Sequence, residues 1–419
     1  MAQTTASSPG LTAADGVPLK TALARAQRRA QRRALMLVAP LLLFVLATFV
    51  IPIGQLLYRS VWNPGFSDNM PAVSAWFEAN PPGTQPDEAA YAALVADLVA
   101  ASEARTIGVV GTRINYDMPG TRSLFTSAAR RADDLTPPFR EGLTALDDAW
   151  ASPELWAVMR ASASAHTPNF YVAALDRKLD ETGSIVRVPP GERVYVPLFW
   201  KTMGLSAAIA AICLVVAFPV AHLLATLPLR QSNLLMVMVL LPFWTSLLVR
   251  TTAWIAILQS QGVVNNALVA TGVVSDANRI PMMYNQTGTI IAMTHILLPF
   301  MILPMYSVMR TIKPTYVRAA RSLGASSWTA FRRVYLPQTL PGMGAGVLLV
   351  FILAVGYYIT PALVGGASGQ LFSNMIAFHM QRSLNWSLAA ALAAILLGAV
   401  LLLYWLYDRL VGIDNMKLG

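Results

Sequence analysis

Six long apolar runs constrain this chain more than any other feature of its sequence. A helix needs about 20 residues to cross a hydrocarbon layer of ~30 Å, and each run is that long. The chain is 55% hydrophobic and only 12% charged, a composition outside the range of ordinary soluble domains. We therefore expect an all-α polytopic membrane protein with six transmembrane helices, at residues 34–57, 202–225, 234–258, 288–309, 342–364 and 388–407.

Positive charges recur at alternate ends of these runs. An arginine-rich arm precedes the first run, Arg230 follows the second, a basic stretch at 310–333 follows the fourth, and Arg409 follows the sixth. Simple alternation of the runs brings all four groups to one side, which is the cytoplasm by the positive-inside rule. We expect both termini in the cytoplasm and residues 59–201 outside.

Two other interpretations of the charge pattern are less favoured. A signal peptide also places arginines before an apolar run, but the first run is too long for that and no A-x-A site follows it, which favours a retained anchor. A net charge of +10 would also suit a nucleic-acid-binding protein. The basic residues flank the runs, however, and are not interleaved with stacking aromatics, so we expect no nucleic-acid partner.

The chain is expected to divide into four parts. Residues 1–33 form a disordered basic cytoplasmic arm, 34–58 the first span, 59–201 a periplasmic insertion domain, and 202–419 a core with spans two to six. The insertion holds thirteen basic and seventeen acidic residues, which leaves eighteen and four elsewhere. Apolar residues recur there at helical spacing, which predicts an α-rich domain with a short hairpin at 183–196.

Within the insertion, prolines mark expected helix starts. Pro137 and Pro138 precede one helical segment, and Pro153 opens another. Paired acids at 133–134 and 147–148 are interpreted as a solvated helix face, since charge runs usually lie in solvent. The single cysteine, Cys213, lies in the second run, so the insertion has no disulfide. We expect no catalytic site and no metal site.

The connection between the fourth and fifth runs is basic and reads RAARSLGASSWTAFRRVYLPQTLP over residues 318–341. Pro314 ends the fourth span, and Thr315 is available to cap a new helix. Val317, Ala320 and Gly324 follow at i, i+3 and i+7, which predicts a face of small side chains that packs closely against a partner.

This connection is expected to contain two helical pieces. Gly324 can adopt the left-handed geometry that separates them, and Ser326 or Ser327 can cap the second piece. Leu336 and Pro337 are expected to end it before span five. From pattern alone, an amphipathic helix held on anionic lipid by its arginines is the other interpretation.

The same residues resemble a known motif. The 318–341 segment is similar to the EAA loop of the membrane subunits of type I binding-protein-dependent ABC importers, with a glycine after the alanine pair and L-P near the end. The stretches LLPFWTSLLVRTTAWIAILQSQGVVN, PFMILPMYSVM and GYYITPALVGG resemble spermidine/putrescine permeases of the PotB and PotH kind. The similarity covers span one and nearly everything from residue 195 onward.

This resemblance implies the MetI-like permease fold in a bacterial inner membrane, with a coupling loop at 311–337. The permease would work with ABC ATPase subunits, a second permease subunit that makes a heterodimer, and a periplasmic substrate-binding protein. The chain has no G-x-x-x-x-G-K-[ST] phosphate loop, so it is expected to be a transport subunit and no enzyme. ATP and Mg are expected on the partner ATPase. The residues implied in coupling are Arg318, Ala319, Ala320, Arg321, Leu323, Gly324 and Ala325.

Two positions depart from the family pattern. Arg318 stands where the family usually has glutamate, so a basic group replaces an acidic contact with the ATPase. Tyr357 stands where polyamine permeases commonly have aspartate, which weakens the case for a cationic solute. The resemblance favours a polyamine (spermidine or putrescine), and an opine or another amino-acid-derived solute is the alternative.

Four residues are candidates for the translocation path: Trp244, Arg250, Tyr357 and Tyr358. Ionisable residues inside spans are commonly functional, but 17 residues counted from Asn233 place Arg250 about 25 Å along a continuous helix, near the outer boundary. Aromatic faces such as those of Trp244 and Tyr357 would assist a cation; Trp254, near a span end, is instead interpreted as part of an interfacial belt. His222 and His295 are expected to be packed and hydrogen-bonded.

Two further classes of protein remain open at this point. An ion-driven secondary transporter should show inverted repeats and intramembrane acids, and neither is visible. A membrane-anchored receptor whose working part is the insertion would not require a hinged loop.

Overall fold

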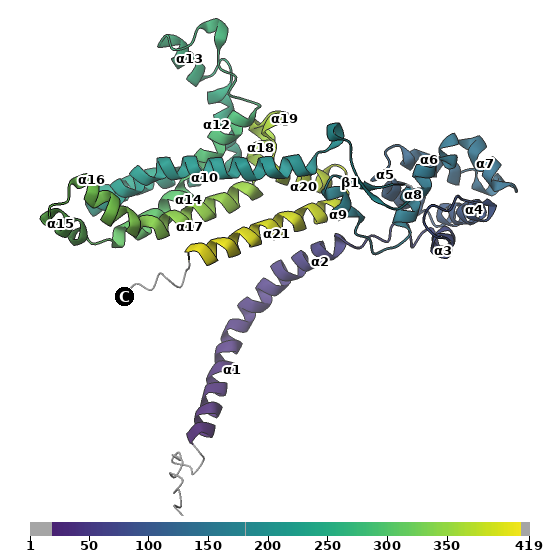
Figure 1. The fold of residues 1–419 in the computed structure, drawn as a ribbon, viewed down its shortest axis with the longest axis horizontal. Helices are drawn as coiled ribbons and strands as arrows, with labels where there is room; N and C mark the ends of the chain where they lie inside the picture. Colours follow the sequence, from purple (N-terminus) through teal and green to yellow (C-terminus); the bar gives the residue numbers. More distant parts are fainter. Residues whose placement is uncertain (1–18, 181, 412–419) are drawn as a thin grey trace, which may run out of the picture. The chain divides into compact units, whose positions relative to one another are not determined.

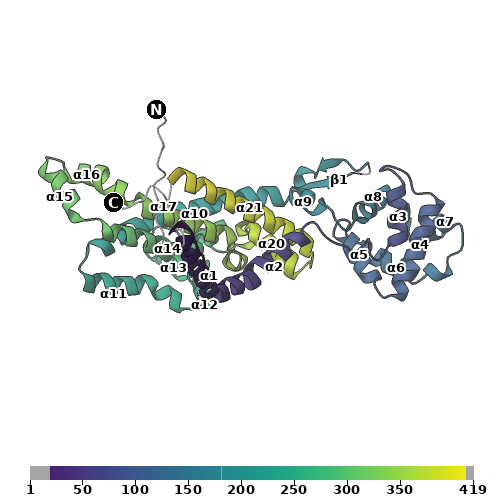
Figure 2. The same cartoon turned by 90° about the horizontal axis from the view of Figure 1, so that it is seen from below.

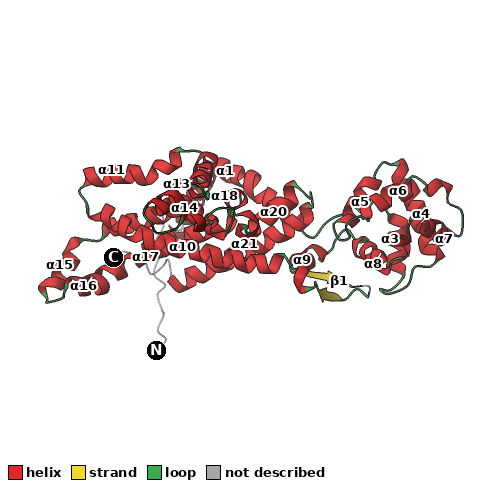
Figure 3. Cartoon of the chain, turned by 90° about the horizontal axis from the view of Figure 1, so that it is seen from above, coloured by secondary structure: helices red, strands yellow, loops and turns green. Residues whose placement is uncertain are grey.

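The computed structural model describes residues 19–180 and 182–411. Most of this length is helical, and six helices in the described residues are long and apolar enough to cross a membrane: Gln27–Arg59, Tyr195–Thr226, Leu247–Ala270, Gln286–Thr311, Ser327–Gly356 and Trp386–Arg409. This confirms the expected all-α class and the count of six. Figure 3 shows how little of the chain is strand.

The N-terminal unit is one helical run. It consists of α1 (Leu19–Val45), a π-helical turn η1 (Leu46–Val50) and α2 (Ile51–Arg59). The prediction of disorder over residues 1–33 is therefore wrong from Leu19 onward, because alanine, leucine, glutamine and arginine are strong helix formers. The expected disorder of residues 1–18 lies outside the described residues.

The insertion is α-rich, as predicted. Its aromatic core includes Phe66, Tyr91, Phe125, Trp150 and Trp156, all at most 4% exposed. The helices are α3 (Pro71–Ala79), α4 (Glu88–Glu103), α5 (Ile107–Asn115), α6 (Thr121–Ala129), α7 (Phe139–Leu146), α8 (Pro153–Ser162) and α9 (Asn169–Ala174), with 3-10 turns η2 (Ala132–Asp134), η3 (Asp148–Ala151) and η4 (Pro190–Glu192).

Two predictions about local structure in the insertion meet different outcomes. Helices begin directly after Pro138 and at Pro153, as expected. A hairpin is present, but its first strand lies upstream of the predicted stretch. Strand β1 (Arg177–Leu179) pairs antiparallel with β2 (Ile185–Arg187), with Lys178 opposite Val186. The strand ends before the prolines, since a proline cannot donate to a ladder; Pro190 begins η4 and Pro189 is its N-cap.

The insertion and the membrane core form one compact unit from Arg59 onward. Phe170 and Ala174 of α9 pack with Leu388, Ala391 and Leu392 of the last helix. The Tyr116 hydroxyl donates to the Leu384 carbonyl (2.9 Å), and the Asn63 amide donates to Ser387 Oγ (3.1 Å). The insertion is therefore fixed to span six by both apolar and polar contacts.

The membrane core is built around α14 (Gln286–Thr311), which packs along α10 (Tyr195–Thr226) and α17 (Leu336–Gly356) (Figure 1). The remaining elements are α11 (Leu229–Leu240), η5 (Leu241–Trp244), α12 (Leu247–Leu258), α13 (Val263–Ala270), η6 (Asp276–Asn278), α15 (Pro314–Ser322), α16 (Ser327–Ala330), the π-helical turn η7 (Phe331–Tyr335), α18 (Ile359–Val364), α19 (Gly366–Gly369), α20 (Phe372–Gln381) and α21 (Trp386–Val411).

Small residues allow α14 and α17 to pack closely. A Cβ added at Gly346 would lie 2.7 Å from Met301 Sδ, and one at Gly342 would lie 2.9 Å from Val308 Cβ. Both separations are shorter than a van der Waals contact, so a larger residue at either position would require a neighbour to shift. Close backbone approach through small residues is a common way for helices to associate in membranes.

Two predicted spans have different limits in the structure. The run at 234–258 is divided between α11 with η5 and α12, and the chain is extended at Thr245 and Ser246. The run at 342–364 ends as a helix at Gly356, and α18 follows as a separate helix. Hydropathy averages over about 19 residues, so it cannot detect a break of one or two residues inside an apolar run.

Asp176 connects the insertion to the start of α10. Its carboxylate accepts hydrogen bonds from the backbone N–H groups of Val194 (3.0 Å), Tyr195 (2.9 Å) and Val196 (2.7 Å). These are donors that a helix start leaves without intrahelical partners, and a negative charge there is favourable. Asp176 is 6% exposed and has a φ of 52°, which Asp and Asn tolerate better than most residues.

We predict that Asp176→Ala lowers the free energy of unfolding by about 1–3 kcal/mol, because buried N–H groups lose their acceptor. Asp176→Asn, which keeps one acceptor and tolerates the same φ, should cost less. The midpoint temperature of the full chain in detergent measures both effects. Glu192→Ala, at a nearby exposed acid, should leave the midpoint unchanged; equal losses for Asp176→Ala and Glu192→Ala would contradict the assignment.

Candidate functional site: the hinged segment and the membrane arginine

The hinged segment (residues 311–337) begins with α15. Pro314 occupies the first turn of this helix, and Lys313 is its N-cap without a side-chain hydrogen bond. The expected cap at Thr315 is therefore wrong, because Pro314 already starts the helix one residue earlier, as proline commonly does. Gly324 follows α15 with a φ of 90°, a conformation that side chains rarely adopt. This confirms the predicted left-handed hinge.

The predicted coupling residues divide into two groups by exposure. Arg318, Ala319, Arg321, Leu323 and Gly324 are exposed, and the Leu323 side chain is 89% exposed. Leu323 is an apolar side chain that the rest of the described chain does not cover, and it lies beside a hinge among exposed arginines. We call these five residues the outer face of the hinged segment.

Ala320 and Ala325 are half-buried, and so is Val317, which packs against the apolar cluster of α10, α14 and α17. The predicted small face of Val317, Ala320 and Gly324 is thus corrected. Two of its members lie toward the chain's own core, because the core offers Val317 more apolar surface than solvent does. The surface left for a partner is the outer face.

The second helical piece does not end before span five. Ser326 caps it by accepting from the Thr329 N–H (3.2 Å), as predicted. The helix then continues through η7 into α17, so Ser327–Gly356 is one span. The expected stop at Leu336 and Pro337 is wrong: the helix continues past both residues. The π-helical turn ends at Tyr335, two residues before Pro337, so the change of helical register lies close to the backbone donor that proline lacks.

Arg250 lies in the second turn of α12, and not 25 Å along a continuous helix. The extended residues at 245–246 separate it from α11, so the count from Asn233 does not apply. Its Nη2 donates to the Thr245 carbonyl (3.1 Å), which satisfies a backbone group at the break. Its Nε is buried without a hydrogen-bond partner in the structure. Arg250 is therefore a half-buried cation that lacks full compensation.

Two of the four path candidates, Arg250 of α12 and Tyr357 directly after α17, are half-buried. Trp254, one turn further along α12, donates from Nε1 to His295 Nδ1 (3.1 Å). By contrast, Trp244 is 73% exposed and Tyr358 is 38% exposed.

The two histidines in the core are packed and hydrogen-bonded, as predicted. His295 accepts from Trp254, and His222 Nδ1 lies 2.9 Å from the Tyr335 hydroxyl. Trp254 was expected in an interfacial belt; it is half-buried and has an internal partner, because an indole N–H inside an apolar core requires an acceptor.

The break at Tyr357 and Tyr358 depends on residues that sequence reasoning did not single out. Ser373 Oγ donates to the Tyr357 carbonyl (2.6 Å), and Asn374 Nδ2 donates to the Tyr358 carbonyl (2.8 Å). Both partners belong to α20 and are at most 9% exposed. The proline and glycines around the break indicated an irregular backbone, but nothing in the sequence indicated which polar residues satisfy it.

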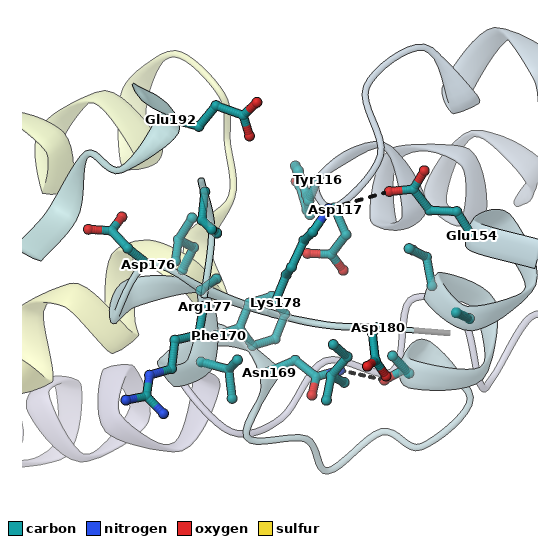
Figure 4. A pocket seen from close by; sticks show the side chains of 18 of the residues that line it. Tyr116, Asp117, Glu154, Asn169, Phe170, Asp176, Arg177, Lys178, Asp180 and Glu192 are labelled. Atoms are coloured by element: carbon teal, nitrogen blue, oxygen red, sulfur yellow. Dashed lines mark hydrogen bonds and ion pairs between the residues drawn. The ribbon is translucent and has the colours of Figure 1, made fainter. Parts of the chain in front are cut away.

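A cavity of about 690 Å³ lies where α8, α9, the hairpin and the start of α21 meet (Figure 4). Five acids line it, and four of them have partners. Asp117 pairs with Arg113 (2.6 Å), Glu154 pairs with Lys178 (3.8 Å), Asp176 caps α10, and Asp180 accepts from the Thr182 hydroxyl (2.6 Å). Glu192 is exposed. Most of these carboxylates are therefore engaged within the protein and do not form an array that would collect a cationic solute.

His379 of α20 is a buried neutral histidine beside this region. Its Nε2 lies 2.9 Å from the Tyr195 hydroxyl and its Nδ1 lies 2.8 Å from Ser383 Oγ. Burial lowers the pKa of His379 to about 4, below the ordinary value of about 6.5. Because the folded state disfavours the imidazolium, stability is complete above about pH 6.5 and falls as the pH decreases toward 4.

We predict that the unfolding temperature of the full chain in detergent falls less between pH 7 and pH 4.5 for His379→Gln than for the unsubstituted protein. The substitution removes a group that must take up a proton on unfolding at low pH. Identical pH dependence in His379→Gln and the unsubstituted protein would contradict the role of His379.

The six candidate spans define the class as an integral membrane protein, and comparison with known proteins identifies its family. Residues 183–412 match the family described as binding-protein-dependent transport system inner membrane component, and the chain belongs to this family. It is the permease of a type I ABC importer, and the insertion up to residue 182 lies outside the match.

The chain is similar to several named permeases. It is 36% identical over 227 residues to the spermidine/putrescine transport system permease protein PotB of Escherichia coli, covering 52% of this chain and 82% of that one. It is 34% identical over 224 residues to PotB of Haemophilus influenzae, covering 54% and 78%. The inner membrane ABC transporter permease protein YdcU of Escherichia coli is 29% identical over 226 residues, covering 52% and 72%.

Among solved structures, the chain matches a bacterial alginate ABC transporter in complex with an alginate-bound periplasmic protein. The match has a TM-score of 0.44 and 16% identity and covers 52% of this chain and 78% of that one.

Proposed function

We propose that this chain imports spermidine, putrescine or a closely related amine as half of an ATP-driven permease. The observation that carries this proposal is the outer face of the hinged segment, exposed at a left-handed glycine in a chain of the importer family. The solute follows from the similarity to PotB. A second permease subunit completes the path, and a binding protein delivers the solute from the periplasm.

ATP and Mg belong to a separate ATPase that binds the outer face. Leu323 enters an apolar pocket of that partner, since a fully exposed leucine gains about 1.5–3 kcal/mol on burial. Arg318 and Arg321 contact acidic groups around this pocket. The hinged segment and both termini are cytoplasmic by the distribution of arginine and lysine, and the insertion is periplasmic.

The experiment that tests ATPase binding is co-purification of the ATPase with this chain. We predict that Leu323→Asp reduces the ATPase retained on the tagged chain at least tenfold, because a charge replaces the apolar contact. Thr315→Asp adds the same charge at an exposed position in the first turn of α15, where an acid is favourable, and should retain the ATPase. Equal retention by both variants would remove Leu323 from the interface.

Arg250 favours a second candidate solute, an opine or another amino-acid-derived compound. The guanidinium attracts a carboxylate and repels an ammonium group, and its Nε has no partner. Within the six candidate spans the only acidic residue is Asp408, next to the last residue of the sixth. Mass spectrometry of the ligand retained by the cognate binding protein distinguishes the two solutes.

We predict that Arg250→Ala impairs transport more than assembly. Uptake of radiolabelled spermidine per assembled complex should fall at least threefold, because the guanidinium that orients the solute is lost. Arg230→Ala, at an exposed arginine in the first turn of α11, is the control and should leave uptake unchanged. Equal uptake by the Arg250→Ala and unsubstituted complexes would remove Arg250 from the mechanism.

A further inference from the structure

A column of aromatic rings begins beside the hinge and runs along one face of the helix that leads into span five. Trp328 stacks on Phe331 with centroids 5.7 Å apart and planes 20° apart, and Phe331 stacks on Tyr335 at 5.8 Å and 24°. The spacing of three and four residues places all three on one face of a helix. We call these three residues the aromatic column.

The column passes from the surface into the core. Trp328 is 67% exposed, Phe331 is half-buried, and Tyr335 is 8% exposed. Phe331 and Tyr335 are the first and last residues of the π-helical turn η7. Such turns are rare, and they occur frequently at functional sites.

The inner part of the column is attached to α10 through Phe218 and His222, and the His222 ring also meets Phe331 edge to face at 6.4 Å. The Tyr335 hydroxyl lies 2.9 Å from His222 Nδ1, and the two rings meet edge to face at 5.0 Å. Phe331 contacts Phe218 edge to face at 6.0 Å. The attachment points at 218 and 222 lie on either side of Pro219, where α10 lacks a backbone hydrogen bond. The column thus meets α10 where that helix bends most easily.

The outer end of the column is close to the proposed ATPase surface. Trp328 is five residues from Leu323, and α15 packs on η7. Val317 of α15 belongs to the same apolar cluster as Phe218, Phe331 and Tyr335. A displacement of α15 would therefore be transmitted to the column by direct side-chain packing.

We infer that the aromatic column and His222 transmit movement of the hinged segment to α10 at Pro219, as positioning residues for coupled transport. Stacked rings suit this role because each has only two side-chain torsions, and close packing transmits displacement rather than absorbing it. The hydrogen bond between Tyr335 and His222 fixes the orientation of the innermost ring. This inference rests on the proposed docking of an ATPase at the outer face.

Two substitutions separate coupling from folding. Phe331→Leu keeps an apolar residue but removes both stacking contacts, and Tyr335→Phe keeps every ring and removes only the hydroxyl. In proteoliposomes with the purified complex and the binding protein, we predict that the spermidine imported per ATP hydrolysed falls about three- to tenfold for each. ATP hydrolysis itself should stay within about twofold of the unsubstituted complex.

The matched control is a ring pair at the other end of the same helix. Phe199 of α10 contacts Phe372 edge to face at 5.5 Å, so Phe199→Leu also removes a contact of α10, away from the column. It should keep the original ratio of import to hydrolysis. An unchanged ratio in Tyr335→Phe and Phe331→Leu, or an equal decrease in the Phe199→Leu control, would overturn the inference.

A second measurement does not require spermidine to be the solute. Spin labels at Ser322→Cys on α15 and Thr226→Cys at the end of α10, with the buried Cys213 replaced by serine, report the distance between the two helices. The change in this distance when ATP is added should differ between the Phe331→Leu complex and the unsubstituted complex. Identical distance distributions with and without the substitution would overturn the inference, whereas failure of the unsubstituted complex to bind ATPase would contradict the proposed function instead.

Discussion

The structure depends on one constraint: a bilayer offers no water to hydrogen-bond a broken helix. Two interruptions inside the core are satisfied by side chains of the protein. The Arg250 guanidinium donates to the carbonyl of Thr245 at the break before α12. Ser373 and Asn374 donate to the carbonyls at the break after α17. Irregular backbone inside a membrane is tolerated only where it is buried in protein or lines a cavity. The hydrogen bonds at these two breaks are the kind of internal partner that such backbone requires.

Much of the architecture followed from physical patterns in the sequence. The length of the apolar runs predicted the six spans, the helical spacing of apolar residues predicted an α-rich insertion, and Gly324 predicted the hinge. What hydropathy could not provide was the limit of each helix. An apolar run has the same average whether it is one helix or two, so the divisions at 245–246 and 357–358 were not predicted. Likewise, Ser373 and Asn374 are ordinary polar residues until the fold places carbonyls beside them.

The hinge at Gly324 was predicted from the sequence, but the orientation of α15 was not. The assignment of individual residues to ATPase coupling stays a prediction. Small residues at i, i+3 and i+7 define a face, yet periodicity does not say whether that face meets the chain's own core or a partner. Val317 is half-buried inside the molecule and Leu323 is 89% exposed, so tertiary packing decided the orientation. The two views in Figures 1 and 2 show α15 and α16 at one end of the core helices.

The helical span from Ser327 to Gly356 has a geometric consequence. Thirty residues at 1.5 Å each give a length of about 45 Å. The π-helical turn and Pro341 both lie in its first half, so the part from Gly342 to Gly356 is the stiffer one. A tilt of the whole span by about 10° around its middle moves each end by about 4 Å in opposite directions, and a push at the hinged segment thereby reaches the far end, beside Tyr357.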